Sequence, residues 1–198
     1  MLVAFFIKGA KHMANKIEIT NAALIAVGSD IIASLSDQTT EAQVVNTIWD
    51  QARRSLLRAN LWNFATKRVE LARSVTPPSF DYAYRYALPS DHIRTVQVFT
   101  DTDYKVENGF VVTNSERCQL KYIADIVDVN LWASDFCEVM SAKLAAEIAF
   151  PLTKDLKVSQ LMYSLFQEKL QAAIWIDASE DIADNYQFDN SLLIGRQT

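Results

Sequence analysis

Few residues in this sequence could carry out chemistry, and histidine is the scarcest of them. His12 and His92 are the only two histidines. A Ser-His-Asp or Cys-His site would have to use His92, which follows Asp91 in a predicted loop. A lone loop histidine is usually an exposed residue without a catalytic role. We therefore expect no nucleophilic active site.

The cysteines and glycines also argue against a catalytic or cofactor-binding site. Cys118 and Cys137 stand alone, without a Cys-x-x-Cys spacing, which is typical of reduced structural thiols; a disulfide between them stays open as the alternative. Zinc needs three or four closely spaced ligands, and the sequence has no such group. Four glycines leave no glycine-rich phosphate loop. We predict no cofactor and no metal.

Carboxylates offer the one enzymatic alternative. Paired acids can cleave glycosidic bonds, and the sequence holds 24 acidic residues. Glu138 and Glu147 lie in one predicted helix, but their spacing puts them about half a turn out of phase at about 100° per residue. A carboxylate-dependent hydrolase of cell-wall glycan is therefore the alternative function, and a non-enzyme is the main prediction.

Composition indicates a folded protein that does not bind nucleic acid by neutralising phosphates. The 198 residues are 50% hydrophobic and 22% charged, with a net charge of -5. The apolar run Leu2 to Ile7 is too short for a membrane span, which needs about 20 residues. The nearby lysines follow this run, whereas the basic residues of a secretory signal precede its apolar run. We expect residues 1–14 to be a leader, either an extension upstream of a start at Met13 or a disordered apolar tail; docking of Leu2 to Ile7 on a neighbouring subunit is the alternative.

Helices are predicted at both ends of the chain, over residues 17–27, 39–59, 136–150 and 156–179. Apolar residues recur at three- and four-residue steps in the last three, and Pro151 is expected to end the third. Arg53, Arg54 and Arg58 fall mainly opposite the apolar side of the second helix. They indicate a solvated face, or alternatively a subunit contact through charge.

Strands are predicted in the middle of the chain. Trp62 and Phe64 are two residues apart, so they could point inward from one strand face. After the prolines of residues 74–79, aromatics alternate from Phe80 to Tyr86, which favours a strand with one buried face. Asn108-Gly109 lies between two short β-favouring runs and predicts a two-residue hairpin turn. A strand over residues 117–124 completes a small antiparallel sheet.

The fold class is therefore α+β, a mainly helical bundle with an inserted small antiparallel β-sheet. The bundle comprises residues 15–79 and 126–179, and the inserted β part comprises residues 80–125. Residues 180–198 form an acidic, then polar tail that we expect to order only against a partner. Its apolar residues are Tyr186, Phe188, Leu192, Leu193 and Ile194.

Several segments together resemble the tail tubular protein A family, the head–tail adaptor of short-tailed phages. They are ITNAALIAVGSDIIASLSD, EAQVVNTIWDQARRSLLRANLWNFATKRVEL, YAYRYALPSDHIR and LKYIADIVDVNLWASDFCEVMSAKLAAEIAFPLTKD, followed by the last long helix. The resemblance covers roughly residues 15–180. No single motif is diagnostic, but their order and spacing are fairly specific. The leader departs from the family pattern.

The resemblance implies a structural protein without catalysis. It implies a ring, by family habit of twelve copies, between the portal protein and the tail nozzle (tubular B-type) protein, through which DNA passes without specific binding. The protein would belong to the virion neck of a phage or prophage and to the bacterial cytoplasm during assembly. By the same analogy, Tyr186, Phe188 and Leu192 to Ile194 would embrace the portal. The Asn108-Gly109 hairpin would face the nozzle.

Overall fold

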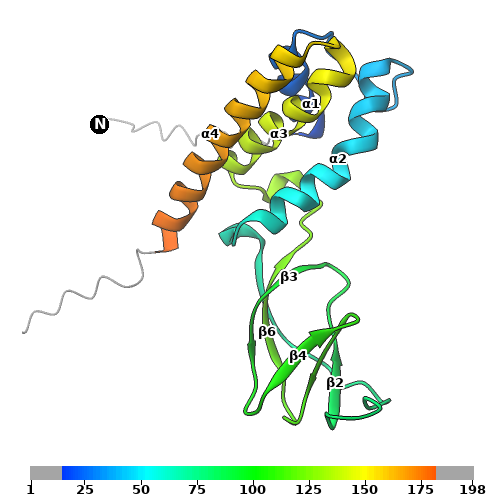
Figure 1. Cartoon of the computed structure of the whole chain (residues 1–198), viewed down its shortest axis with the longest axis vertical. Helices are drawn as coiled ribbons and strands as arrows, with labels where there is room; N and C mark the ends of the chain where they lie inside the picture. Colours follow the sequence, from blue (N-terminus) through cyan, green and yellow to red (C-terminus); the bar gives the residue numbers. More distant parts are fainter. Residues whose placement is uncertain (1–14, 182–198) are drawn as a thin grey trace, which may run out of the picture.

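The computed structural model describes residues 15–181. A helical bundle forms one half of this part of the chain, and a β part extends from it along the long axis (Figure 1). The fold class predicted from the sequence, α+β, is confirmed. The helices of the described residues are α1 (Lys16–Val27), α2 (Thr40–Ala59), α3 (Ser134–Thr153) and α4 (Leu156–Asp181), with short 3₁₀ turns η1 (Asn63–Ala65) and η2 (Val129–Leu131). None of them is long and apolar enough to cross a membrane.

Side-chain hydrogen bonds cap the starts of α1 and α2. Asn15 and Glu18 form a reciprocal capping box at the start of α1, and Gly28 ends that helix in a left-handed conformation with φ 78°. Thr39 caps α2. The prediction that Pro151 ends α3 was wrong, because the helix continues to Thr153. Only two residues of the helix follow Pro151, which lacks the N–H that would donate to the carbonyl four residues earlier.

The bundle is built around α3, which contacts α1, α2 and α4. Phe136 of α3 is fully buried and makes edge contacts with three rings. The ring centroids lie 5.0 Å away for Trp132, 5.1 Å for Trp62 and 4.8 Å for Phe64. Trp132 in turn stacks on Trp49 of α2 at 6.2 Å. This aromatic cluster is the centre of the bundle core.

Trp62 and Phe64 point inward as expected, but not from a strand. Both belong to the turn at η1, where Trp62 is fully buried and its indole Nε1 donates to the Leu56 carbonyl at 2.9 Å. The helix α2 ends just before them, so the turn folds both rings onto Phe136. The two rings therefore point to the same side because of a tight turn, and not because side chains alternate along a strand.

The β part contains two antiparallel three-stranded sheets, where the sequence predicted one. Sheet A has the order β1-β6-β3, and sheet B has the order β2-β5-β4. The strands are β1 (Thr66–Glu70), β2 (Tyr84–Ala87), β3 (His92–Phe99), β4 (Tyr104–Glu107), β5 (Phe110–Thr113) and β6 (Gln119–Ala124). The β part therefore begins at Thr66 and not at residue 80, because β1 pairs with β6 from Thr66↔Ile123 to Glu70↔Gln119.

The alternating aromatics predicted a longer strand than the structure contains. Only Tyr84 and Tyr86 lie in β2, whereas Phe80 is 77% exposed. Asp81 has φ 68°, a left-handed conformation that interrupts an extended chain. Tyr86 is buried, and its hydroxyl donates to the Ser115 carbonyl at 2.9 Å. The alternating aromatic residues therefore belong to a loop beside sheet B and to the short strand β2 that follows it.

The hairpin predicted at Asn108-Gly109 is confirmed. The turn joins β4 to β5, with Glu107 opposite Phe110. Both central residues have positive φ, 46° for Asn108 and 78° for Gly109. That pair of conformations defines the turn that suits the twist of a two-residue hairpin, and asparagine and glycine tolerate it best.

Candidate functional site

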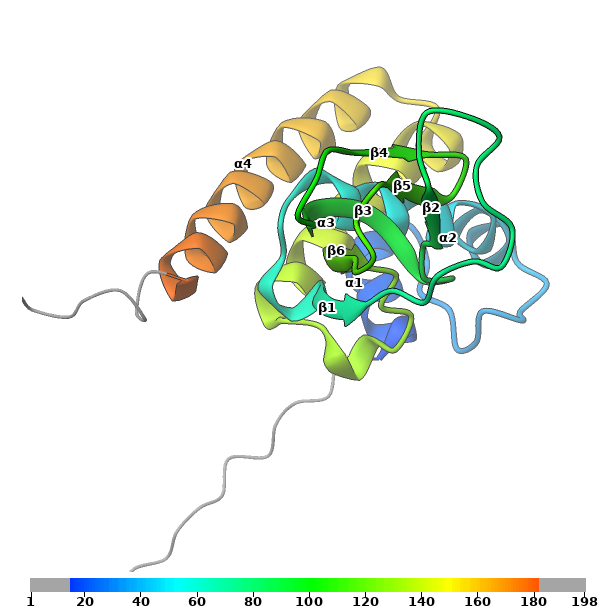
Figure 2. The same cartoon turned by 90° about the horizontal axis from the view of Figure 1, so that it is seen from below.

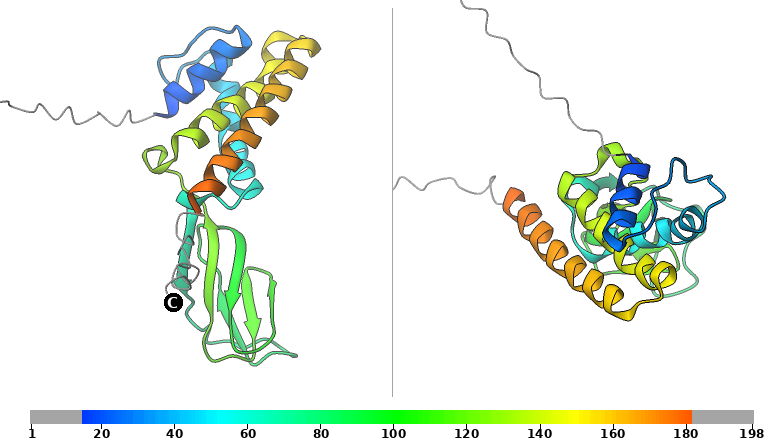
Figure 3. Two further views of the ribbon diagram at one scale, coloured as in Figure 1. Left: turned by 90° about the vertical axis from the view of Figure 1, so that its left-hand side faces the viewer. Right: turned by 90° about the horizontal axis from the view of Figure 1, so that it is seen from above.

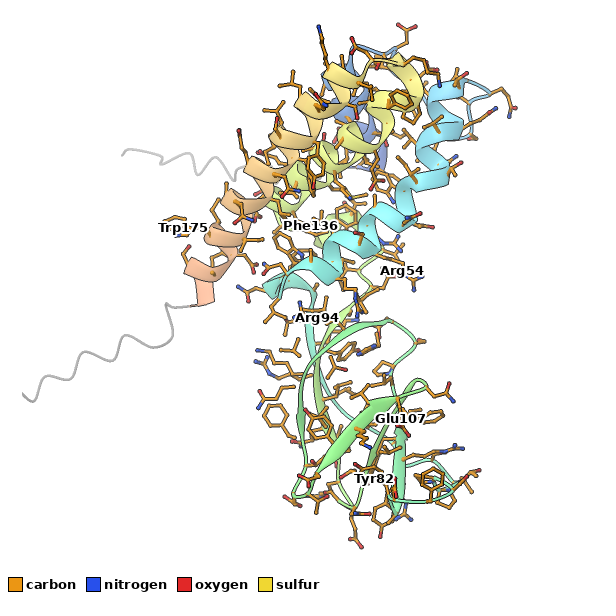
Figure 4. All side chains as sticks on the ribbon, viewed as in Figure 1. Arg54, Tyr82, Arg94, Glu107, Phe136 and Trp175 are labelled. Carbon is orange, nitrogen blue, oxygen red and sulfur yellow. The ribbon has the colours of Figure 1, made fainter. Side chains whose placement is uncertain are left out.

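The place where the bundle meets the β part concentrates charged groups that are hydrogen-bonded to one another. It is formed by the second half of α2, the start of β3, the end of β6 and the start of β1. Viewed from below, the strands lie in front of the bundle (Figure 2). Arg54 and Arg94 mark its level in Figure 4. We refer to it as the junction.

Arg53 and Asp125 form the buried ion pair of the junction. The Arg53 Nε lies 3.0 Å from Asp125 Oδ1, and its Nη2 lies 3.1 Å from Oδ2. The third guanidinium nitrogen, Nη1, donates to Asp50 Oδ1 at 2.8 Å. Arg53 is only 5% exposed, so its prediction as part of a solvated face was wrong. Its partner lies far along the sequence, and helical periodicity carries no sign of such a pair.

The other two arginines of α2 also reach into the junction while keeping contact with solvent. Arg54 Nε lies 3.2 Å from Asp125 Oδ2, with the Arg54 side chain 59% exposed. Arg58 Nη1 donates to the Ile93 carbonyl at 2.8 Å, and Arg94 Nη1 donates back to the Arg58 carbonyl at 3.3 Å. These reciprocal bonds tie the end of α2 to β3.

Asp91, directly before β3, is hydrogen-bonded to residues of β1 and β6 and to the residue that follows β6. It accepts hydrogen bonds from Lys67 Nζ at 2.7 Å and from the Tyr122 hydroxyl at 3.0 Å, and its carbonyl accepts from the Asp125 N–H at 2.7 Å. Burial raises the pKa of Asp91, but the bonds from Lys67 and Tyr122 outweigh it, and the pKa lies below its ordinary value. Burial, then the bond to Asp91, raises the pKa of Tyr122 to about 12.

His92 is part of this network and not a free loop residue. It begins β3, stacks on Tyr122 with ring centroids 5.8 Å apart, and shares a hydrogen bond of 2.9 Å between Nε2 and Thr95 Oγ1. Burial, and then the charge of Arg58, lowers the pKa of His92. The hydrogen bond to Thr95 and the stacking on Tyr122 hold the ring in place at the start of β3.

The free end of α4 is fixed beside the junction by Asp177. This buried side chain accepts a hydrogen bond from the Asn63 N–H at 3.0 Å, and the Asn63 Nδ2 donates to the Asp177 carbonyl at 2.8 Å. Asn63 belongs to η1, directly before β1. The last helix, the turn after α2 and the first strand are therefore connected. No local sequence pattern signals this contact between residues so far apart.

The residues considered for chemistry are engaged in structural contacts. Glu138 pairs with Lys169 at 3.3 Å, and Glu147 pairs with Lys143 at 2.8 Å. Cys118 and Cys137 are free thiols, each with a pKa raised to about 11, by burial and, at Cys137, also by a nearby acid. Within residues 15–181, no cluster of histidine, cysteine and acidic side chains has the arrangement of a metal site.

The predicted partner-binding residues fall in two places. Asn108 and Gly109 lie at the end of the β part nearer the bundle, since the Leu88 N–H donates to the Gly109 carbonyl at 2.9 Å and Leu88 leads into the junction. Glu107, just before the turn, lies nearer the bundle than Tyr82 in Figure 4. The tail residues, which are Tyr186, Phe188, Leu192, Leu193 and Ile194, lie outside the described residues.

Comparison with known proteins gave no match to a family model and no match to a curated protein.

Proposed function

We propose that the protein is a structural head–tail adaptor that assembles as a ring between a phage portal and a tail nozzle and forms part of the DNA passage. The observation that carries the proposal is the resemblance of segments spread over roughly residues 15–180, in order and spacing, to the tail tubular protein A family. The location that follows is the neck of the virion, with assembly in the bacterial cytoplasm.

The arrangement of the two halves supports this role. An adaptor has to contact one partner at each end and keep the two contacts at a constant angle. Here a helical half and a β half lie one after the other along the long axis (Figure 1). The junction between them is held by directional, charge-assisted hydrogen bonds from Arg53, Arg58 and Asp91. Such bonds fix an orientation better than apolar contact of similar area.

The placement of the hairpin changes one part of the proposal. Because Asn108 and Gly109 lie at the end of the β part nearer the bundle, we assign the nozzle contact to the opposite end of the β part. That end carries the loop with Phe80 and Tyr82, and Phe80 is 77% exposed. The portal contact stays assigned to the tail, residues 180–198, of which the first two belong to α4.

The net charge of -5 per chain suits a passage that DNA crosses without binding. Attractive phosphate contacts would hold the DNA in place. Arg53 and Arg54 are paired with Asp125, and Arg58 donates to a backbone carbonyl, so these guanidinium groups already have partners within the chain.

A truncation tests the portal contact. We expect a chain ending at Asp181 to lose binding to the purified cognate portal while keeping the helical circular-dichroism signal of the full chain. The matched variants Phe80→Ser and Tyr82→Ser should leave portal binding unchanged and weaken binding to the nozzle protein. Unchanged portal binding after truncation would refute the role of the tail.

A further inference from the structure

One face of sheet A is open to solvent, whereas its other face buries Val98, Leu120 and Tyr122 in the core. The open face carries two rows of side chains that run across β1, β6 and β3. The first row is Arg68, Lys121 and Gln97, and the second row is Glu70, Gln119 and Phe99. Lys121 is half-buried and the other five residues are exposed. We call these six residues the outer face of sheet A.

The outer face of sheet A carries positive charge that is not neutralised within the described part of the chain. Arg68 of β1 lies directly opposite Lys121 of β6 in the antiparallel ladder. Like charges in this position repel each other. Among residues 15–181 neither side chain forms an ion pair, whereas Glu70 in the next row lies 3.9 Å from Arg117. A carboxylate placed over the first row would therefore be stabilising.

A hollow lies beside this pair of charges. Its volume is about 290 Å³, and its lining includes the side chains of Arg68, Glu70 and Phe99. Phe99 is 45% exposed, so an aromatic side chain in the hollow would remove apolar surface from water. The outer face of sheet A therefore suits an extended, acidic segment that also carries aromatic side chains.

The chain contains such a segment soon after α4. Residues 184–189 read DNYQFD, in which Asp184, Tyr186 and Phe188 alternate with other residues. An extended chain presents alternate side chains on the same side. Arg196 is the only basic residue after Asp181, so the segment has no positive charge of its own to repel Arg68.

The position of α4 brings this segment to sheet A. Asp177 of α4 is hydrogen-bonded to Asn63, and β1 begins three residues later at Thr66. Figure 3 shows the free end of α4 at the level where the strands begin. Figures 1 and 2 both show β6 of sheet A nearer to that end than β2 of sheet B.

The length of the segment is also sufficient. The row that contains Phe99 lies level with Glu70, about 13 Å along β1 from Thr66 at about 3.3 Å per residue. The seven residues from Asp181 to Phe188 can span up to about 23 Å when extended. Phe188 can therefore reach the hollow from the end of α4.

We propose that residues 182–189 dock on the outer face of sheet A of their own chain. The segment runs beside β1 and in the same direction, with Phe188 in the hollow against Phe99. Asp184 then lies within reach of Arg68 and Lys121, and the Tyr186 ring lies beside the Arg68 guanidinium, a favourable cation–π arrangement.

This contact belongs to the free chain and does not depend on the adaptor function. Tyr186 and Phe188 are also the residues assigned above to the portal contact, so sheet A and the portal would compete for them. The tests below use the chain without a portal. Their failure would remove the contact with sheet A and leave the portal contact to be tested by its own truncation.

Disulfide cross-linking in the full chain tests where the segment docks. The double variant Phe99→Cys with Phe188→Cys is oxidised at low protein concentration, and the linked peptides are identified by mass spectrometry. We expect a link within one chain. The matched control pairs Phe188→Cys with Val106→Cys, which is 42% exposed on β4 of sheet B, and should link little. The unmodified chain, with its free Cys118 and Cys137, gives the background.

Two cross-linking results would overturn the proposal. Equal linking to residue 99 and to residue 106 would mean that the segment has no preferred site. Links between two chains in place of links within one chain would mean that the occupant is the tail of another copy.

Chymotrypsin cleavage after the two tail aromatics tests the role of charge. We expect Arg68→Glu to accelerate this cleavage about fivefold, since cleavage follows the undocked population and opposite charges beside each other contribute up to about 1 kcal/mol. Adding Asp184→Arg should slow it again. Lys105→Glu on the exposed strand β4 should leave the rate unchanged. Cleavage after Phe80, which is 77% exposed, is the internal reference for a folded β part. An unchanged rate in Arg68→Glu, or no recovery in the double variant, would overturn the proposal.

Discussion

The bundle and the β part of this protein are held together by different kinds of interaction. The bundle has a continuous apolar core around Phe136, on which the rings of Trp62, Phe64 and Trp132 pack, and Trp49 of α2 stacks on Trp132. The β part consists of two small sheets, and β4 is exposed along its whole length. Between them lies the junction, where Arg53 and Asp91 supply hydrogen bonds instead of apolar area.

The stability of the bundle and the orientation of the β part therefore depend on different interactions. Apolar burial is non-directional and roughly proportional to area, so it stabilises the bundle without fixing an angle. Charge-assisted hydrogen bonds contribute less area but depend on geometry. Changes in the bundle core should therefore unfold the protein, whereas changes in the junction should also change how the β part is held.

The largest effect is expected from Phe136→Ala. The ring is fully buried and contacts three other aromatic rings, so its removal should lower the free energy of unfolding by about 5 kcal/mol, at the upper end for such changes. Urea denaturation followed by circular dichroism measures it. Phe150→Ala is the matched control on the same helix, where the side chain is 45% exposed and the loss should be much smaller.

Breaking the buried ion pair should cost somewhat less. Asp125→Ala leaves Arg53 buried without its main partner, and we expect a loss of about 3 kcal/mol. Asp50→Ala removes the other carboxylate that contacts Arg53, but Asp50 is 76% exposed, so about 1 kcal/mol or less should be lost. Equal losses in the two variants would show that the junction does not depend on the buried pair.

Acid should weaken the junction in two steps. The pKa of His92 is lowered from 6.5, so the unfolded chain takes up a proton as pH falls through 6.5 while the folded chain does not, and stability is lost. The pKa of Asp91 is also lowered, from 3.8, so its contribution is present above 3.8 and is lost as pH falls through the folded pKa. Melting temperatures measured from pH 8 to pH 3 should fall by a few degrees in each step.

Two variants separate those steps. His92→Gln should remove the loss between pH 7 and pH 5 and keep the one at lower pH. Asp91→Asn should do the reverse. A single step that neither variant alters would mean that other groups govern the acid response.

The smallest effect is expected at the hairpin. Gly109 has φ 78°, and an alanine there should cost about 1 kcal/mol, with hydrogen exchange accelerated in β4 and β5 and unchanged in α3. Asn108→Gly keeps the turn geometry and should leave exchange in both strands unchanged. Faster exchange throughout the bundle in Gly109→Ala would contradict the separation between the two halves.

The sequence predicted what depends on neighbouring residues. Periodicity placed the long helices, and the Asn108-Gly109 pair placed a hairpin, because both signals lie within a few residues of each other. It did not predict the pairing of β1 with β6, or the contacts of Arg53 with Asp125 and of Asn63 with Asp177. Those join residues 49 or more positions apart, and local patterns do not encode which distant strand or charge will meet. The alternation from Phe80 predicted too long a strand, because a loop can have the same spacing of aromatic residues as a strand.

Native mass spectrometry of the full chain with a cognate portal tests the proposed adaptor function. We expect one closed set of copies on each portal, twelve if the family habit holds, and none after truncation at Asp181. A portal that binds no copies of the intact chain would contradict the adaptor function, and an open series of masses would contradict the ring.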